Sequence, residues 1–447
     1  MFGRGVGLWW LIVLASSFLS GETLVAGIHR APIIIPGFKI KAMTRYPLDL
    51  YRLYRTGPRG EAVPIPFQID EVNQFGDYVL DQGPAPNRTT GNHLFDLQDE
   101  LSFMGDDVGP IGPPTVWPTP KPSILFELRF SRRSTGEMSG GAVFVGIHIN
   151  EAPPPLVDQK YVVFNLEQGT VLSSRYRYEF DKRNYLVVNG VGMVKAPVPP
   201  QLVSESLRVI DSSTFFMKAD LKYFVTFLAN HRSVDSKLEA FKTGPVRTIV
   251  RVTFIYSVLK LNFELGMYTE VSFFTNSVIL PAIMYNPIDG RQTLNNGSGF
   301  YYGFTLHDNP ASLDIQTNIQ PFQEKKGLLD RFKSVTGLES KYWVTMVGSD
   351  RMMFVEIVPS PTMLADQNIP YFYRKDQSGP ELSAVDNSEP RDLSSSRVNL
   401  GLYFDLTKFR KGEHIMSFKL FFENKRDLAE LESFKTLGDW YYRVSRI

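Results

Sequence analysis

Apolar and polar residues alternate along much of the chain, as they do in strands that bury one face. From Lys260 to Phe273 apolar residues stand at almost every second position. A period of two over this length predicts a long half-buried strand, or two strands around a bulge at Gly266. Similar alternation predicts strands at Ile124–Phe130, Ala142–Ile149, Tyr161–Leu166, Tyr185–Val194, Arg247–Val258, Tyr342–Val347, Met353–Val358 and Ile415–Phe422.

Helical patterns are few and short. Glu324–Val335 and Asp427–Leu437 have helical spacing, and Asp427 stands at a position suited to an N-cap. We interpret both segments as packing helices. Because aromatic residues make up 13% of the chain and 30 prolines interrupt it, the composition favours large antiparallel sheets. The sequence therefore predicts a mainly β fold: a large antiparallel β-sandwich, a smaller N-terminal β unit and few short helices.

Proline-rich and polar stretches suggest where the chain divides. Residues 108–122 contain six prolines, and such a stretch cannot form a central strand. We therefore expect an N-terminal β domain at residues 27–118 and a large sandwich domain at residues 119–447. Residues 376–397 are polar and rich in turn-forming residues, which predicts an exposed, mobile loop within the second domain.

The first residues have the pattern of a secretory signal peptide. Arg4 precedes an apolar run from Leu8 to Leu19, and small residues lead to Ala26. The run is shorter than the roughly 20 residues of a transmembrane helix, although a retained N-terminal anchor is the alternative. No later stretch is long and apolar enough to span a bilayer. We expect residues 1–26 to be removed and the mature chain to be exported to the periplasm, cell surface or extracellular space.

Composition excludes several classes of chemistry. The chain has no cysteine, which excludes disulfides, thiolate metal sites and a cysteine nucleophile. Its 48 basic and 47 acidic residues leave a net charge of +1. The chain therefore lacks the excess of basic residues that would indicate nucleic-acid binding. The histidines do not have zinc-motif spacing, and neither a nucleophile elbow nor a phosphate-binding loop is present.

An acidic segment at residues 95–110 is a candidate metal site. Asp96, Asp99, Asp106 and Asp107 offer the oxygen ligands that calcium prefers. Leu101 occupies the position that is glycine in an EF-hand loop, so that template does not fit. Two interpretations stay open: a strand edge with a turn, or a calcium site completed by oxygens from elsewhere. The segment at residues 66–83, with its own acidic residues, is the expected partner.

The same two segments contain paired acids. Asp70 and Glu71 follow one apolar stretch, and Asp99 and Glu100 begin another. Two carboxylates held close together could act as acid and base in glycoside hydrolysis. Nothing in the sequence brings the pairs together, and paired acids are common on exposed strands.

Two further groups of residues are candidates for ligand chemistry. His231 and Arg232, after Tyr223, could supply a base and a neutralising cation for β-elimination from a uronic acid, although a simple loop after a strand is the alternative. Aromatic residues at Phe300, Tyr301, Tyr302 and Trp440 could stack on sugars, pack in a β core or line a protein interface.

Two segments carry a resemblance to a known class of proteins. "TGPVRTIVRV" at residues 243–252 and "FRKGEHIMSFKLFFEN" at residues 409–424 resemble the strand order and glycine-glutamate turn of secreted β-supersandwich proteins related to galactose mutarotases and polysaccharide lyases. The resemblance implies stacked antiparallel sheets and a carbohydrate-facing surface. No catalytic residue of those families matches a position here.

These observations lead to two hypotheses of function. In the first, an exported protein recognises or processes an extracellular or envelope polysaccharide. In the second, a non-catalytic envelope protein binds a protein partner, as an assembly factor or accessory subunit. A groove lined by aromatic residues and acids would support the first hypothesis, whereas an exposed apolar patch would support the second.

Overall fold

The chain folds into two compact units that interleave along the sequence. A computed structural model describes residues 31–132, 140–195, 198–203, 206–222, 225–230, 234–258, 261–286, 288–307, 314–319, 342–348, 351–365, 371–375, 399–424 and 440–447. Unit 1 comprises residues up to Val162 together with Ala240–Ile249 and Asp427–Ile447, and unit 2 comprises Val163–Glu239 and Val250–Arg426. Each unit is described by itself.

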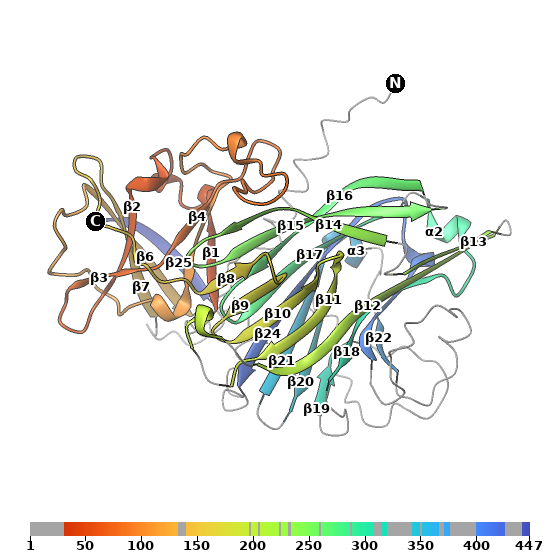
Figure 1. The fold of residues 1–447 in the computed structure, drawn as a ribbon. Helices are drawn as coiled ribbons and strands as arrows, with labels where there is room; N and C mark the ends of the chain where they lie inside the picture. Colours follow the sequence, from red (N-terminus) through yellow and green to blue (C-terminus); the bar gives the residue numbers. More distant parts are fainter. Residues whose placement is uncertain are drawn as a thin grey trace. The chain divides into compact units, whose positions relative to one another are not determined.

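Unit 1 contains two antiparallel sheets, which Figure 1 shows in red to yellow with the C-terminal strand in blue. The first sheet has the order β1 (Pro32–Pro36), β5 (Glu100–Met104) and β4 (Gln68–Asp70). The second has the order β25 (Trp440–Arg446), β6 (Ile124–Arg132), β7 (Gly140–Ile147), β2 (Tyr51–Thr56) and β3 (Ala62–Ile65).

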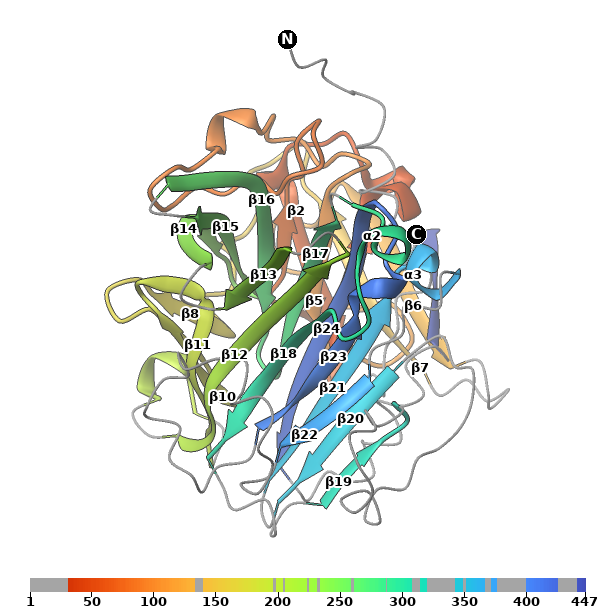
Figure 2. The ribbon, with the colours of Figure 1, turned by 90° about the vertical axis from the view of Figure 1, so that its right-hand side faces the viewer.

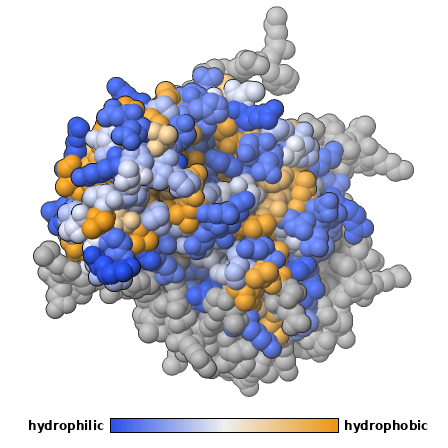
Figure 3. Space-filling model, turned by 60° about the vertical axis from the view of Figure 1, so that its left-hand side comes forward, coloured by the Kyte–Doolittle hydropathy of each residue, from blue (hydrophilic) through white to orange (hydrophobic). Residues whose placement is uncertain are grey.

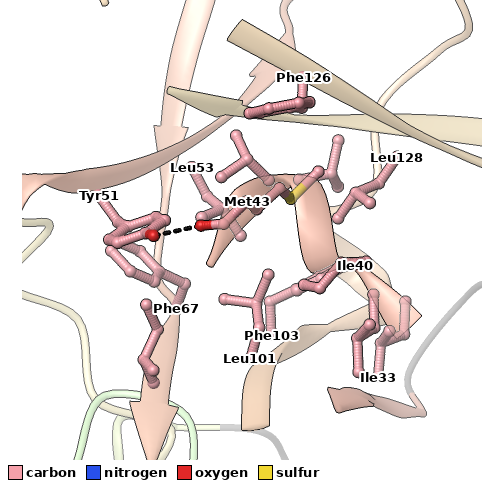
Figure 4. Close-up of a cluster of buried hydrophobic side chains, with 14 of the residues drawn as sticks. Ile33, Ile40, Met43, Tyr51, Leu53, Phe67, Leu101, Phe103, Phe126 and Leu128 are labelled. Atoms are coloured by element: carbon pink, nitrogen blue, oxygen red, sulfur yellow. Dashed lines mark hydrogen bonds between the residues drawn. The ribbon is translucent and has the colours of Figure 1, made fainter. Parts of the chain in front are cut away.

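Alternating apolar residues from these strands form one core (Figure 4). Leu101 and Phe103 of β5, Leu53 of β2, and Phe126 and Leu128 of β6 are almost completely buried. The hydroxyl of Tyr51 donates to the main-chain carbonyl of Met43, so this buried polar group is satisfied. Burial of alternate residues explains why these sequences form strands.

Unit 2 is a sandwich of two large sheets. Its first sheet has the order β22 (Tyr371–Lys375), β23 (Asn399–Asp405), β18 (Gly299–Leu306), β12 (Leu207–Leu221), β11 (Asn184–Met193), β10 (Tyr176–Asp181), β9 (Thr170–Ser173) and β8 (Val162–Asn165), and β13 (Val225–Asn230) pairs with β12. Figure 2 shows β12, β18 and β23 side by side.

The second sheet runs β14 (Val234–Thr243), β15 (Thr248–Val258), β16 (Leu261–Phe273), β17 (Ser277–Asn286), β24 (Gly412–Asn424), β21 (Arg351–Pro359), β20 (Tyr342–Val347) and β19 (Asp314–Thr317). Rings from the two sheets meet: Tyr178 lies 5.0 Å from Phe273, and Tyr302 lies 6.0 Å from Phe418, between ring centroids. A small apolar cavity of about 50 Å³ lies between the sheets. These contacts define the inner face of the first sheet.

The helices in the described part of the chain are short. The α-helices are α2 (Gly290–Thr293), which Asp289 caps by accepting from the main-chain N–H of Arg291, and α3 (Pro361–Ala365). The 3-10 helices are η1 (Gly37–Lys39), η2 (Lys41–Met43), η3 (Leu48–Leu50), η4 (Arg88–Thr90), η5 (Gly105–Asp107), η6 (Pro200–Leu202) and η8 (Leu406–Lys408). Among the described residues, no helix has the length and hydrophobicity needed to cross a membrane.

The predicted fold class is confirmed, because large antiparallel sheets dominate the described chain. The segment around Gly266 forms one continuous strand, β16. Unit 1 continues past residue 118, because β6 pairs with β7 and β7 pairs with the earlier strand β2 in one sheet. The predicted signal peptide, the two predicted helices and the predicted loop at residues 376–397 lie outside the described residues.

Candidate functional site

The first half of the acidic segment closes a turn. Asp99 is buried, and its carboxylate accepts the main-chain N–H groups of Val72 at 2.8 Å and Asp96 at 2.6 Å. Burial raises the pKa of Asp99 to about 6, despite these hydrogen bonds. Both of its oxygens are therefore already used to join the turn to the end of β4.

The second half of the segment is anchored by one tyrosine. Asp106 and Asp107 lie in η5, and both oxygens of Asp107 accept from the Tyr161 hydroxyl, at 2.9 and 2.8 Å. Burial raises the pKa of Asp107 to about 6. Within the described ranges, no group of three or more histidine, aspartate or glutamate residues is arranged to hold a metal ion. A calcium site at Asp96, Asp99, Asp106 and Asp107 stays a prediction.

The paired acids of the two segments do meet. Asp70 of β4 stands directly opposite Glu100 of β5. Arg247 bridges them, with Nε 2.7 Å from Asp70 and Nη2 2.7 Å from Glu100. Lys242 Nζ lies 2.9 Å from Asp70, and the Tyr78 hydroxyl donates to Glu100 at 2.7 Å. We call Asp70, Glu100, Lys242 and Arg247 the buried ion network.

Electrostatics gives the buried ion network a structural role. Burial alone would raise the pKa of Asp70, but the charges of Lys242 and Arg247 outweigh it and lower the pKa to about 2. The neighbouring Tyr78, Asp70 and Glu100 hold the pKa of Arg247 well above its usual value in spite of burial. A glycosidase acid needs a raised pKa. Asp70, which its cationic partners hold ionised, is therefore not arranged to act as that acid.

The aromatic cluster after Gly299 packs within unit 2. Phe300 and Tyr302 point to the inner face, where Phe300 meets Phe404 at 6.0 Å and Tyr302 meets Phe418. Tyr301 lies on the outer face but is only 7% exposed. Trp440 lies in β25, and its side chain is outside the described residues.

The predicted catalytic group, His231 with Arg232 and Tyr223, also lies outside the described residues. Its proposed role in β-elimination stays a prediction.

A polar hollow on the outer face of the first sheet of unit 2 was not predicted. Tyr176, Tyr178 and Phe180 of β10 are buried, whereas Arg177 and Glu179 between them face outward. Register places Arg177 opposite Gly192 of β11, and Gly192 opposite Arg208 of β12. Two arginines thus flank a strand position that has no side chain. The resulting hollow is about 410 Å³ and is lined by Arg177, Glu179, Gly190, Val191, Gly192, Ser206 and Arg208.

Glycine is needed at the floor of the polar hollow. A Cβ atom at Gly190 would lie 2.4 Å from Nη2 of Arg208, and one at Gly192 would lie 2.2 Å from Oγ of Ser206. The side chains of Arg208 and Ser206 therefore lie directly over the backbone of β11. Larger residues at the two glycine positions would displace these groups and occupy the hollow.

Glu179 holds both arginines in place. Arg177 Nε donates to one carboxylate oxygen at 2.7 Å, and Arg208 Nη2 lies 3.5 Å from the other. Arg208 also donates to the main-chain carbonyl of Asn189. The side chains of Arg177, Glu179 and Arg208 are 27%, 30% and 43% exposed. They are ordered by the protein yet accessible to a ligand.

A histidine–carboxylate pair adjoins Arg208. Asp211 Oδ1 lies 2.8 Å from Nδ1 of His307 and 3.5 Å from Nε of Arg208. A register shift between Ile210 and Ser212 places Asp211 at an irregularity of β12. In neutral His307, a hydrogen bond from Nδ1–H to Asp211 would leave Nε2 as a proton acceptor.

Some residues of the polar hollow belong to patterns that can be recognised in the sequence. The alternation of Arg177 and Glu179 with aromatic residues, and of Gly190 with Gly192, is visible in the sequence. Pairing across three strands is not, because it depends on registers between β10, β11 and β12 that include irregularities.

Comparisons with known proteins give little further guidance. No protein-family model matches the chain, and no curated protein matches it. Two similar solved structures are an alpha-mannosidase from Enterococcus faecalis V583, with 7% identity and a TM-score of 0.40, and a protein in the glycosyl hydrolase family 38 from Enterococcus faecalis, with 7% identity and a TM-score of 0.39. Each match covers 93% of this chain, which spans 44% and 46% of those two chains. Likeness at this level assigns neither a fold family nor an activity.

Proposed function

We propose that this chain is an exported protein that recognises or processes a polysaccharide through the polar hollow. The supporting observation is the row of Arg177, Gly192 and Arg208 across three strands. Arginines donate hydrogen bonds and Glu179 accepts them, whereas each sugar hydroxyl can do both. Fixed donors and acceptors around the polar hollow suit the hydroxyl groups of a sugar ring.

The dimensions of the polar hollow agree with this proposal. Small-molecule sites typically have volumes of about 300–1,000 Å³, and the hollow has about 410 Å³. Because the hollow lies on the outer face of a sheet and its side chains are partly exposed, a polymer could continue beyond the bound unit.

The histidine–carboxylate pair supports processing as well as recognition. Asp211 would fix the orientation of His307 and leave one ring nitrogen to exchange a proton. His307 is 45% exposed and is linked to the hollow through Asp211 and Arg208. It would be the group to test first if a bound polysaccharide is cleaved.

Binding to a panel of polysaccharides tests the proposed function. Residues 27–447 are titrated with acidic and neutral polysaccharides, with calcium and with a chelator, and each binder is assayed for cleavage. We expect binding to at least one polysaccharide, and its loss in Gly192→Leu, which fills the hollow. Circular dichroism and the unfolding midpoint check that this variant is folded. No binding across the panel would contradict the proposal, whereas binding that needs calcium would support the predicted site at residues 95–110.

One observation favours the alternative function, binding of a protein partner. In β13, the side chains of Val225, Phe227 and Leu228 are each 47% exposed, and β13 pairs with β12. Exposed apolar residues on an edge strand favour pairing with another chain. On the face of the molecule that Figure 3 shows, hydrophobic residues lie among hydrophilic ones.

The Phe227→Lys variant tests this alternative. Wild type and variant are compared for retention of proteins from an envelope extract and for self-association by light scattering. A partner retained by wild type and lost by the variant would support a protein-binding role. Identical behaviour of the two proteins would contradict it.

A further inference from the structure

The guanidinium group of Arg177 has an unused edge. Its Nε donates to Glu179 at 2.7 Å, and among the described residues neither Nη atom has a protein partner. The bond at Nε fixes the plane of the group, while the side chain is 27% exposed and lines the polar hollow. The Nη1 and Nη2 groups of a side chain that lines the polar hollow are thus available to a ligand.

The charges around the polar hollow are compatible with an anionic ligand. The residues that line it include two arginines and one glutamate, and Glu179 contacts both arginines. A further acid, Asp211, contacts His307 at 2.8 Å and Arg208 at 3.5 Å. The Nη edge of Arg177 is a cationic group that the described residues leave open for a ligand.

The chemistry of that edge indicates a carboxylate. Two parallel N–H donors match the two oxygens of a carboxylate and bind it more strongly than neutral acceptors do. A lone hydroxyl group can use only one of the donors. A sugar with a carboxylate substituent would therefore use Arg177 fully, while its hydroxyl groups reach Glu179 and Ser206.

We propose that the polar hollow binds a carboxylated sugar unit of an acidic polysaccharide, with Arg177 as the residue that determines this specificity. The inference rests on the proposed function and makes it narrower. Arg177 donates two hydrogen bonds from Nη1 and Nη2 to the sugar carboxylate, and Glu179 keeps the guanidinium group in position.

The test compares one polysaccharide with its own carboxyl-reduced form, in which each carboxylate is replaced by a neutral hydroxymethyl group. Affinities of residues 27–447 for both polymers are measured by calorimetry at fixed ionic strength. A bidentate charge-assisted contact should give the carboxylated form an affinity at least about tenfold higher. A polysaccharide of the same backbone that carries sulfate groups in place of carboxylates shows whether any anion suffices.

Three variants identify the responsible residue. Arg177→Gln should reduce affinity for the carboxylated form to that of the reduced form, and Arg177→Lys should lose most of the preference because an ammonium group cannot form the paired contact. Arg183→Gln is the matched control: it removes the same charge just after β10, from a side chain that is 92% exposed and paired with Asp181. The control should keep the full preference.

The outcomes separate this inference from the proposed function. Equal affinity for the carboxylated and reduced polymers, or a stronger preference for the sulfated one, would overturn the inference while the proposed function stands. A preference that survives in Arg177→Gln would also overturn it. Failure of every polymer to bind would overturn both.

Discussion

Two groups of arginine and carboxylate residues in this protein use the same chemistry in opposite ways. In unit 1, Arg247 is 1% exposed and joins Asp70 to Glu100. In unit 2, Arg177 and Arg208 share Glu179, but all three side chains stay partly exposed around the polar hollow. The first group is closed by protein partners, and the second leaves the Nη edge of Arg177 open.

This difference shows that burial and completeness of contacts indicate a role better than residue type does. A buried ion pair is costly to break, because the remaining charge is left in a poorly solvated place. A partly exposed pair contributes little stability, because water screens it, and its donors can be used for a ligand. The comparison predicts effects of different size in the two units.

The largest effect is expected from Arg247→Met. The substitution leaves Asp70 facing Glu100 and removes the arginine that joins them, while Lys242 and the Gln68 amide still contact Asp70. We expect a loss of about 3 kcal/mol or more. Urea unfolding measures the loss, and hydrogen exchange should show weaker protection in β4 and β5. Arg183→Met is a control, because Arg183 is 92% exposed in its pair with Asp181, and it should cost less than about 1 kcal/mol.

An intermediate effect is expected from pH, through Asp99 and Asp107. Burial raises both pKa values to about 6, above the unfolded value of about 3.9. The folded state therefore holds more protons between these values, and unit 1 should become more stable as pH falls from about 7 to about 4.

Asp70 should make the free energy of unfolding change with pH in the opposite direction below that range. Its pKa is lowered to about 2 in the folded state, so its contribution is complete above about pH 4 and is lost as pH falls toward 2. Urea unfolding across pH should show the highest stability between about pH 4 and 5. Asp107→Asn should flatten the upper slope, and an unchanged profile in that variant would contradict the assignment.

The smallest effect is expected from Arg177→Met. Because Arg177 is partly exposed and Glu179 is its one ion-pair partner in the described part of the chain, we expect a stability loss below about 1 kcal/mol, measured by the same urea unfolding. A loss of stability as large as that of Arg247→Met would contradict the distinction between the two groups, since the residues of the polar hollow would then have a structural role too.

The sequence predicts strands well where one face is buried. The alternation at Ile124–Phe130 and Ile415–Phe422 corresponds to β6 and β24, because burial of every second residue is a local property of a strand. The proline-rich stretch at residues 108–122 connects strands of unit 1, so its composition alone does not indicate where a unit ends.

The sites were harder to predict because they depend on distant residues. The acidic segments were expected to be partners, and β4 and β5 do bring Asp70 beside Glu100. Arg247, which decides the role of that pair, comes from a hairpin far along the chain. For the polar hollow, Arg177 and Arg208 are separated by a strand whose register no local pattern reveals.

The interleaving of unit 1 along the chain also constrains the order in which a newly made protein can fold. β25 pairs with β6 along its whole length, from Trp440 opposite Arg132 to Arg446 opposite Phe126, yet all of unit 2 is synthesised between them. Until β25 arrives, β6 has an open edge of the kind that pairs with other chains. We expect the growing polypeptide to depend on protection of that edge until synthesis is almost complete.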